Sequence, residues 1–192
     1  MRYRNYSLTP LWVIMALNFL LFLAVIISPI LIGILGLMPA AFPTHPWTIV
    51  TSMFVHSGFW HIFANMVTLY FFGTFLFRLV GRNGFLTVYF GGGLLGNALF
   101  ILSALILGTD YFTIAIGASG AIYAVAGALV VMMPKLPVRL YFIIPMPLWV
   151  VVLVFFVLFS FLPGVAWQAH LGGLVFGLIA GYFFRRKRLY LF

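Results

Sequence analysis

Long apolar stretches, separated by only a few charged residues, constrain this chain more than any other feature. Of its 192 residues, 66% are hydrophobic and 6% are charged. A water-soluble domain with so few charged groups would expose a largely apolar surface to water, whereas a lipid bilayer accepts such a surface. The composition therefore predicts an integral membrane protein.

Six apolar stretches have the length and boundaries expected of membrane-spanning helices. A transmembrane helix needs about 20 predominantly apolar residues, and polar residues, glycines or prolines separate the stretches from one another. We therefore expect an all-α membrane protein, a six-transmembrane-helix bundle that forms a single domain over residues 1–192. The expected spans are 11–37, 59–80, 84–107, 117–133, 146–162 and 168–184.

The basic residues are confined to alternate connections between the expected spans. All ten lie near the two ends of the chain, or in or within three residues of the second and fourth connections, and the other three connections carry none. The positive-inside rule then predicts that both termini are cytoplasmic. The net charge of +9 is explained by this topology and by attraction to anionic lipid, so nucleic acid is not an expected partner. The ten residues are Arg2, Arg4, Arg78, Arg82, Lys135, Arg139, Arg185, Arg186, Lys187 and Arg188.

Four polar side chains from three spans are expected at one level near the outer face. With this topology the second, fourth and sixth spans enter from outside, and His61, Ser119 and His170 each lie within about two residues of a span's start. Asn65 lies one turn below His61 on the same helix face. Because unpaired polar groups are costly in hydrocarbon, we expect these side chains to contact one another.

Small residues give the fourth and sixth spans a reason to pack closely. Stripes of small residues let the backbones of two membrane helices approach, as a hydrogen bond between Ser119 and His170 requires. Tyr123, one turn below Ser119, is placed to pack against the imidazole. The stripes are Gly173, Gly177 and Gly181 on the sixth span, and Gly120, Ala124 and Gly127 or Ala128 on the fourth.

Three motifs, in order along the chain, resemble those of the rhomboid family of intramembrane serine proteases. The resemblance extends from about Trp47 to Gly181. The motifs are His56-Ser57-Gly58-Phe59-Trp60-His61 followed by Asn65, Gly117-Ala118-Ser119-Gly120 followed by Tyr123, and Ala169-His170-Leu171-Gly172-Gly173 with Gly177.

The resemblance implies a role for each matching residue. It implies a serine endopeptidase that hydrolyses a peptide bond in or near the transmembrane segment of a membrane protein substrate. No cofactor is expected. The implied roles are nucleophile for Ser119, general base for His170, oxyanion stabilisation for His61, Asn65 and the Ser119 backbone N–H, support of the site for His56 and Gly117, and support of the imidazole for Tyr123.

Two positions depart from the family pattern. Thr48 follows Trp47 where the family often has arginine, and Phe77 stands where it often has an acidic residue. In the family these positions are thought of as structural. The departures therefore bear on loop anchoring and stability rather than on chemistry.

The single carboxylate of the chain limits the possible mechanisms. A Ser-His-Asp triad would need Asp110 beside His170, but Asp110 lies in the third connection, several residues before the fourth span, so we predict a Ser-His dyad. The absence of glutamate excludes a zinc protease of the HExxH type. An aspartyl protease would need two aspartates. A metal site made of His56, His61 and His170 would leave Ser119 and Asn65 unexplained, so no metal is predicted.

Two other functions share the apolar composition. A catalytically silent relative that binds transmembrane helices would use the same fold, but the presence of both Ser119 and His170 argues against it. A channel or carrier would line a path across the bilayer with polar groups, whereas the polar groups here lie on the outer side. We expect a multi-pass protein of the cell membrane whose active site opens to the extracytoplasmic side, with the bilayer and a transmembrane substrate as its partners.

Overall fold

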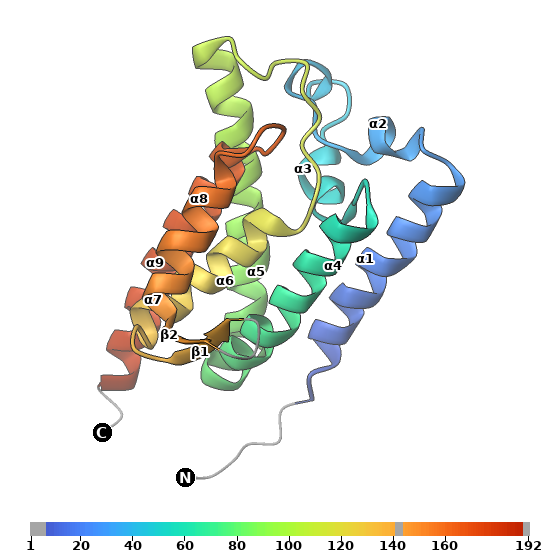
Figure 1. The fold of residues 1–192 in the computed structure, drawn as a ribbon. Coiled ribbons are helices and arrows are strands. Elements are labelled where there is room, and N and C mark those ends of the chain that lie inside the picture. The colour runs from blue at the N-terminus through green and yellow to red at the C-terminus, as the bar shows by residue number, and fades with distance from the viewer. Residues whose placement is uncertain (1–6, 141–143, 190–192) are drawn as a thin grey trace.

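The chain folds into a bundle of helices in a computed structural model that describes residues 7–140 and 144–189 (Figure 1). A short antiparallel hairpin, in which Val138 pairs with Met146, joins two of the helical segments. The elements are α1 (Thr9–Ile27), α2 (Leu31–Leu35), η1 (Pro39–Ala41), α3 (Thr48–Thr51), η2 (Ser52–Phe54), α4 (Phe59–Thr68), η3 (Leu69–Gly73), α5 (Thr74–Leu107), α6 (Ser119–Met132), β1 (Pro137–Leu140), β2 (Ile144–Pro147), α7 (Leu148–Val150), η4 (Val151–Phe156), α8 (Val157–Ser160) and α9 (Trp167–Leu189).

The first helix is shorter than predicted. The expected span was 11–37, but α1 ends at Ile27, and the separate short helix α2 follows after a turn. Pro29 explains the break, because proline cannot donate a backbone hydrogen bond and disfavours helical geometry in the residue before it. That residue, Ser28, has φ −137° and ψ 86°. The apolar run was therefore a correct sign of membrane character and a wrong sign of helix length.

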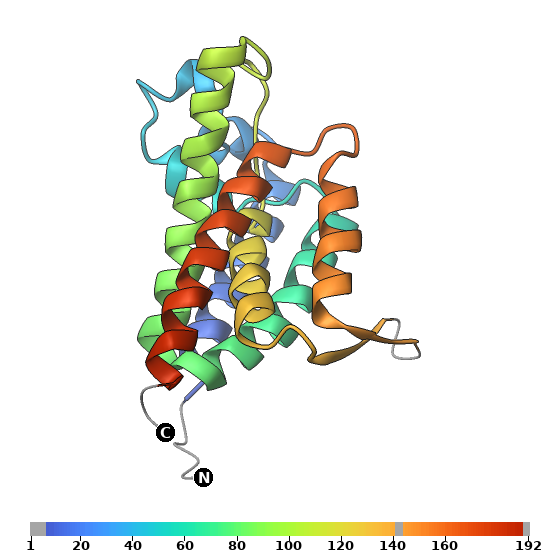
Figure 2. The ribbon, with the colours of Figure 1, turned by 90° about the vertical axis from the view of Figure 1, so that its left-hand side faces the viewer.

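The second and third predicted spans are divided at one glycine. Helical structure continues from Phe59 to Leu107, but Gly81 within it has φ 75° and ψ −177°. Glycine adopts this geometry without the steric cost of a side chain. The chain reverses direction there, so that α4 and most of α5 run in opposite directions (Figures 1 and 2).

Helix α6 lies in the interior of the bundle, packed against α5 and α9 (Figure 2). Every residue from Gly120 to Leu129 is buried. The helix has 14 residues and is about 21 Å long, which is shorter than the roughly 30 Å thickness of bilayer hydrocarbon. The segment 109–118 descends from the end of α5 to the start of α6, so α6 begins deeper in the bundle than the point at which α5 ends (Figure 1).

Three helical stretches among the described residues are long and apolar enough to cross a membrane. They are Thr9–Ile27, Phe59–Leu107 and Trp167–Arg186; two shorter apolar helices, Ser119–Met132 and Leu148–Ser160, lie between the last two. With the reversal at Gly81, these helices overlap the six predicted apolar stretches in sequence.

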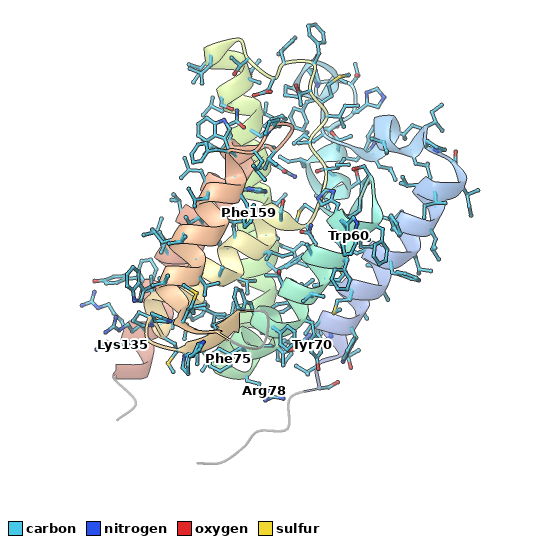
Figure 3. The ribbon with its side chains drawn as sticks, in the orientation of Figure 1. Trp60, Tyr70, Phe75, Arg78, Lys135 and Phe159 are labelled. Carbon is cyan, nitrogen blue, oxygen red and sulfur yellow. The ribbon has the colours of Figure 1, made fainter. Side chains whose placement is uncertain are left out.

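Basic side chains lie at the end of the bundle where α1 begins and α9 ends. Arg78 and Lys135 are at this end, while Trp60 and Phe159 lie further along the bundle (Figure 3). Arg2 and Arg4, which carry part of the predicted charge pattern, are outside the described residues.

The two positions that depart from the rhomboid pattern have structural partners of their own. The Trp47 indole N–H donates to a backbone carbonyl of α2 at 3.1 Å, and the Thr48 hydroxyl donates to the carbonyl of His45 at 2.6 Å. Phe77 is fully buried in the core. The loop that contains Trp47 is therefore anchored without an arginine, and an apolar side chain fills the position where the family often has an acid.

Candidate active site

Ser119 and His170 are in direct contact. Ser119 is the first residue of α6, and His170 lies in the first turn of α9. The Oγ atom of Ser119 lies 2.7 Å from Nε2 of His170, a normal length for a hydrogen bond to an imidazole nitrogen. His170 is only 9% exposed, so protein surrounds the bond on most sides.

The contact depends on an unusually close approach of α6 and α9. A Cβ atom built on Gly173 would lie 1.9 Å from the carbonyl oxygen of Gly120, and one built on Gly177 would lie 2.0 Å from that of Ala124. Cβ atoms are essentially never found closer than 3.0 Å to another heavy atom in this way. The two stripes of small residues therefore face each other, and backbone packs directly on backbone.

Two side chains hold the opposite side of the imidazole. The ring of Tyr123 stacks on that of His170, with centroids 4.2 Å apart and planes inclined by 15°. The Nδ1 atom of His170 lies 2.9 Å from the hydroxyl oxygen of Ser160, which in turn lies 2.7 Å from the Tyr123 hydroxyl. The imidazole thus contacts α6 and α8 while being carried by α9.

Ser160 is not among the residues predicted from the sequence. It is the only side chain with a hydroxyl group between Leu148 and Leu162, and it lies near the C-terminal end of that apolar stretch. The same criterion that singled out Ser119, a lone polar group in an apolar helix, also applies to Ser160. Ser160 is not part of a recognisable sequence motif, so the sequence pattern alone did not assign it to the site.

The two hydroxyl groups that contact the His170 ring can each donate or accept, and one arrangement of the protons suits a base at Nε2. For Ser119 O–H to donate to Nε2, that nitrogen must carry a lone pair, so the proton of the neutral ring belongs on Nδ1. Nδ1–H then donates to the oxygen of Ser160. This tautomer is the one that a general base at Nε2 requires.

His61 lies against the segment that leads to Ser119. Gly117 has φ 115°, a left-handed geometry that side chains rarely adopt. A Cβ atom built there would lie 2.7 Å from Nε2 of His61 and 3.8 Å from Oγ of Ser119. Glycine is therefore required at this position, and the imidazole of His61 and the hydroxyl of Ser119 flank the same point.

Asn65 and His56 complete this side of the site. The side-chain amide of Asn65 donates one N–H to the carbonyl of His61 at 2.8 Å, which leaves its second N–H for another acceptor. His56 is fully buried and packs edge-on against His61, with ring centroids 4.8 Å apart. Burial, and to a smaller extent the nearby His61, lowers the pKa of His56 to about 3, so this ring is neutral at physiological pH.

A second network, also absent from the predicted site, holds the Gly117 turn. The backbone N–H of Gly117 donates to the carbonyl of Ser52 at 2.9 Å. Asn97, on α5, donates to the Ser52 hydroxyl at 2.9 Å and to the carbonyl of Ile49 at 2.7 Å. The position of the turn therefore depends on α3, η2 and α5.

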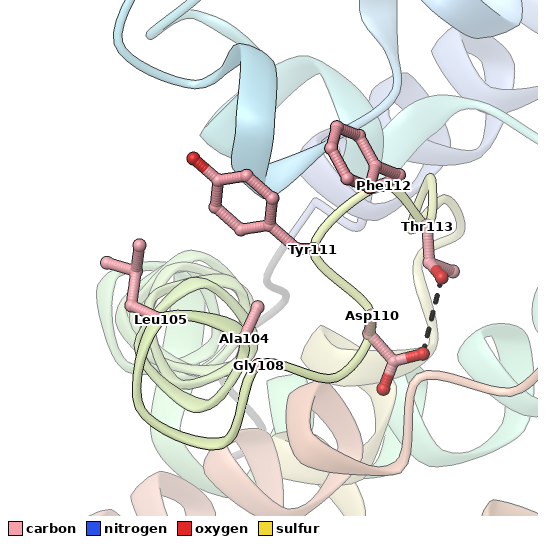
Figure 4. A pocket seen from close by; sticks show the side chains of 7 residues that line it. All are labelled: Ala104, Leu105, Gly108, Asp110, Tyr111, Phe112 and Thr113. Carbon is pink, nitrogen blue, oxygen red and sulfur yellow. Dashed lines mark hydrogen bonds between the residues drawn. The ribbon is translucent and has the colours of Figure 1, made fainter.

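Asp110 contacts α9 without contacting the catalytic candidates. Its carboxylate accepts one hydrogen bond from the Gln168 amide at 3.0 Å and another from the Thr113 hydroxyl at 3.3 Å (Figure 4). The carboxylate lines a surface pocket with Tyr111 and Phe112. Asp110 thus fixes the first turn of α9, while a hydroxyl takes the place beside Nδ1 of His170 that an aspartate has in a triad.

A metal centre has no candidate among the residues that the structure describes. No group of three or more histidine, cysteine, aspartate or glutamate side chains in those ranges is arranged to hold an ion. His170 in particular has both ring nitrogens engaged with serine hydroxyls.

The sequence of the chain is similar to known proteins over most of the region that contains Ser119 and His170. The family model of the Rhomboid domain matches residues 43–187, more than half of the chain. "Rhomboid protein 1, mitochondrial" of Saccharomyces cerevisiae is 28% identical over 77% of this chain and 44% of its own length. "Putative rhomboid protease YdcA" of Bacillus subtilis is 35% identical over 42% and 38%, and "RHOMBOID-like protein 12, mitochondrial" of Arabidopsis thaliana is 33% identical over 52% and 33%. The matches cover less than half the length of each of these relatives, and the chain belongs to the rhomboid family.

Proposed function

We propose that this chain is an intramembrane serine endopeptidase that uses Ser119 and His170 to hydrolyse a peptide bond in or near the transmembrane segment of a membrane protein. The observation that carries the proposal is the 2.7 Å contact between Ser119 Oγ and His170 Nε2 inside an apolar helical bundle. A half-buried hydroxyl and a buried imidazole are costly in such surroundings unless they interact.

The reaction begins at the Ser119 hydroxyl. His170 Nε2 takes its proton while Oγ attacks the carbonyl carbon of the scissile bond, and the imidazolium then gives the proton to the leaving amine. A water molecule, deprotonated by the same nitrogen, hydrolyses the acyl-enzyme and regenerates the serine. Each step needs the lone pair or the proton on Nε2, and therefore the Nδ1–H tautomer.

The oxyanion of the tetrahedral intermediate would be stabilised from the side opposite His170. The donors are the second amide N–H of Asn65, a ring N–H of His61 and the backbone N–H of Ser119. The last has no acceptor within α6 because it belongs to the first turn, where the helix dipole also favours negative charge. Each donor is expected to contribute roughly 10² to 10³ in rate.

The orientation that we propose places both termini in the cytoplasm and opens the site to the extracytoplasmic side of the cell membrane. The distribution of basic residues supports this topology. A helical substrate hides its carbonyls in backbone hydrogen bonds, so the segment to be cut must unwind locally before Ser119 can attack.

Cleavage by the purified chain, reconstituted in liposomes with a single-span model substrate, tests the proposal. We expect cleavage by the wild type and no cleavage by Ser119→Ala or His170→Ala. Ser103→Ala is the matched control, because among the described residues the Ser103 hydroxyl on α5 bonds the carbonyl of Phe100 in its own helix and no other group. Equal activity in all four proteins would refute the dyad, and binding of the substrate without cleavage by the wild type would favour the silent relative.

A further inference from the structure

Ser160 bonds the side of the general base that faces away from the nucleophile. The residue is the last of α8, is only 5% exposed, and lies within hydrogen-bond distance of both His170 Nδ1 and the Tyr123 hydroxyl. These contacts join three different helices at one ring, since His170 comes from α9 and Tyr123 from α6.

The chemistry of a base at Nε2 gives Ser160 a defined task. An imidazole in an apolar interior can hold its proton on either nitrogen, and only the Nδ1–H form accepts from Ser119. A hydrogen-bond acceptor at Nδ1 favours that form and limits rotation of the ring. The Ser160 oxygen, 2.9 Å from Nδ1, can act as such an acceptor, and the Tyr123 hydroxyl lies 2.7 Å from that oxygen.

We propose that Ser160 is a positioning residue, which selects the Nδ1–H tautomer of His170 and aims Nε2 at Ser119. The inference rests on the proposed protease function, in which it takes the position that an aspartate has in a triad. Because a neutral hydroxyl does not stabilise the developing imidazolium as a carboxylate would, its loss should cost less than the roughly 10⁴-fold of a misoriented triad.

The location of Ser160 on α8 adds a consequence for the assembled site. Ser119 and His170 are held together by the glycine contacts between α6 and α9, whereas Ser160 reaches the ring from another element. The aim of the base therefore depends on the outer end of α8 being packed against the bundle. Displacement of α8 would release Nδ1 while leaving the glycine contacts intact.

Kinetics of three variants test the proposal against a merely structural role. We expect Ser160→Ala to lower kcat by about tenfold with KM within twofold of the wild type, the size of one lost neutral hydrogen bond. Ser160→Thr, which keeps the hydroxyl, should recover most of kcat, and Ser103→Ala should match the wild type. Tyr123→Phe, which keeps the stacked ring and loses the hydroxyl bonded to Ser160, should lower kcat less than Ser160→Ala. The thermal unfolding temperature of each variant shows whether it is folded.

Nitrogen-15 NMR of histidine-labelled protein gives a readout that needs no activity. The chain has four histidines, and the spectrum of His170→Ala assigns the signals of His170. We expect a protonated Nδ1 and an unprotonated Nε2 in the wild type, and a mixture of the two tautomers in Ser160→Ala. Unchanged kcat, or a lowered kcat with an unchanged tautomer, would overturn the proposal. Absence of cleavage by the wild type would instead refute the protease function.

Discussion

Replacing Gly177 with alanine should separate α6 from α9 and disable the site two helical turns away. The added Cβ would lie 2.0 Å from the carbonyl oxygen of Ala124 and 2.7 Å from two further backbone atoms of that residue. None of these atoms belongs to a flexible side chain, so no rotamer change relieves the contact. The two helix backbones must move apart.

The distance by which α6 and α9 must separate determines how much cleavage rate and stability are lost. Restoring an ordinary contact requires a separation of at least about 1 Å, which would lengthen the 2.7 Å bond between Ser119 and His170 beyond hydrogen-bond range. Misplacement of reacting groups by about 1 Å can cost roughly 10²-fold in rate. Overpacking of this kind is also expected to lower the free energy of unfolding by about 1–3 kcal/mol.

Cleavage kinetics and thermal unfolding of the purified protein measure the two effects. Gly33→Ala is the control, because a Cβ built on Gly33 meets no atom within 4 Å. Gly120→Ala, whose Cβ would lie 3.3 Å from the nearest backbone atom, should show a milder loss than Gly177→Ala. If Gly177→Ala retains wild-type kcat and stability, or if Gly33→Ala loses as much, direct packing of α6 on α9 does not hold the dyad together.

Three further predictions concern the oxyanion side. Gly117→Ala should abolish cleavage, because its Cβ would strike the His61 ring and the backbone there has left-handed geometry. Gly58→Ala should retain cleavage, because the backbone at Gly58 is extended and a Cβ there meets no atom within 4 Å. Cleavage assays of the two variants check this pair of predictions. Asn65→Ala should lower kcat by roughly 10² to 10³ with little change in KM; comparable kinetics in the variant and the wild type would remove Asn65 from the oxyanion site. The folded protein resists protonation of His56 until about pH 3, while the unfolded chain binds that proton near pH 6.5, so the free energy of unfolding should fall as pH drops through this window. Denaturant titrations should show a shallower fall in His56→Phe, and an equal slope in both proteins would contradict the assignment.

The sequence predicted the membrane class and most helix positions because both follow from long apolar runs and their breaks. The charge pattern and the glycine stripes predicted which helix ends meet and which faces pack. The sequence pattern did not predict the end of α1 at Ile27. Apolar residues continue past Pro29, and the length of the apolar run was given more weight than the proline. Nor did the pattern indicate that Ser119 begins a short helix deep in the bundle, because the descent of residues 109–118 is a tertiary feature.

Some residues of the candidate site could be predicted from the sequence, and others could not. Residues that lie in recognisable motifs, such as Ser119 and His170, could be proposed from the sequence. Ser160 and Asn97 act through contacts with residues far away in the chain, the latter with Ser52 at a separation of 45 residues. A single chain carries no local pattern for such pairings, so only the three-dimensional arrangement reveals them.

Covalent labelling by a fluorophosphonate measures whether His170 activates Ser119, because the reagent reacts with a serine only when a base activates it. The purified wild-type protein is treated with the reagent, and the modified residue is located by mass spectrometry of the digested chain. We expect a single adduct at Ser119, absent in Ser119→Ala and strongly reduced in His170→Ala. An unlabelled wild type, or equal labelling in His170→Ala, would contradict this expectation.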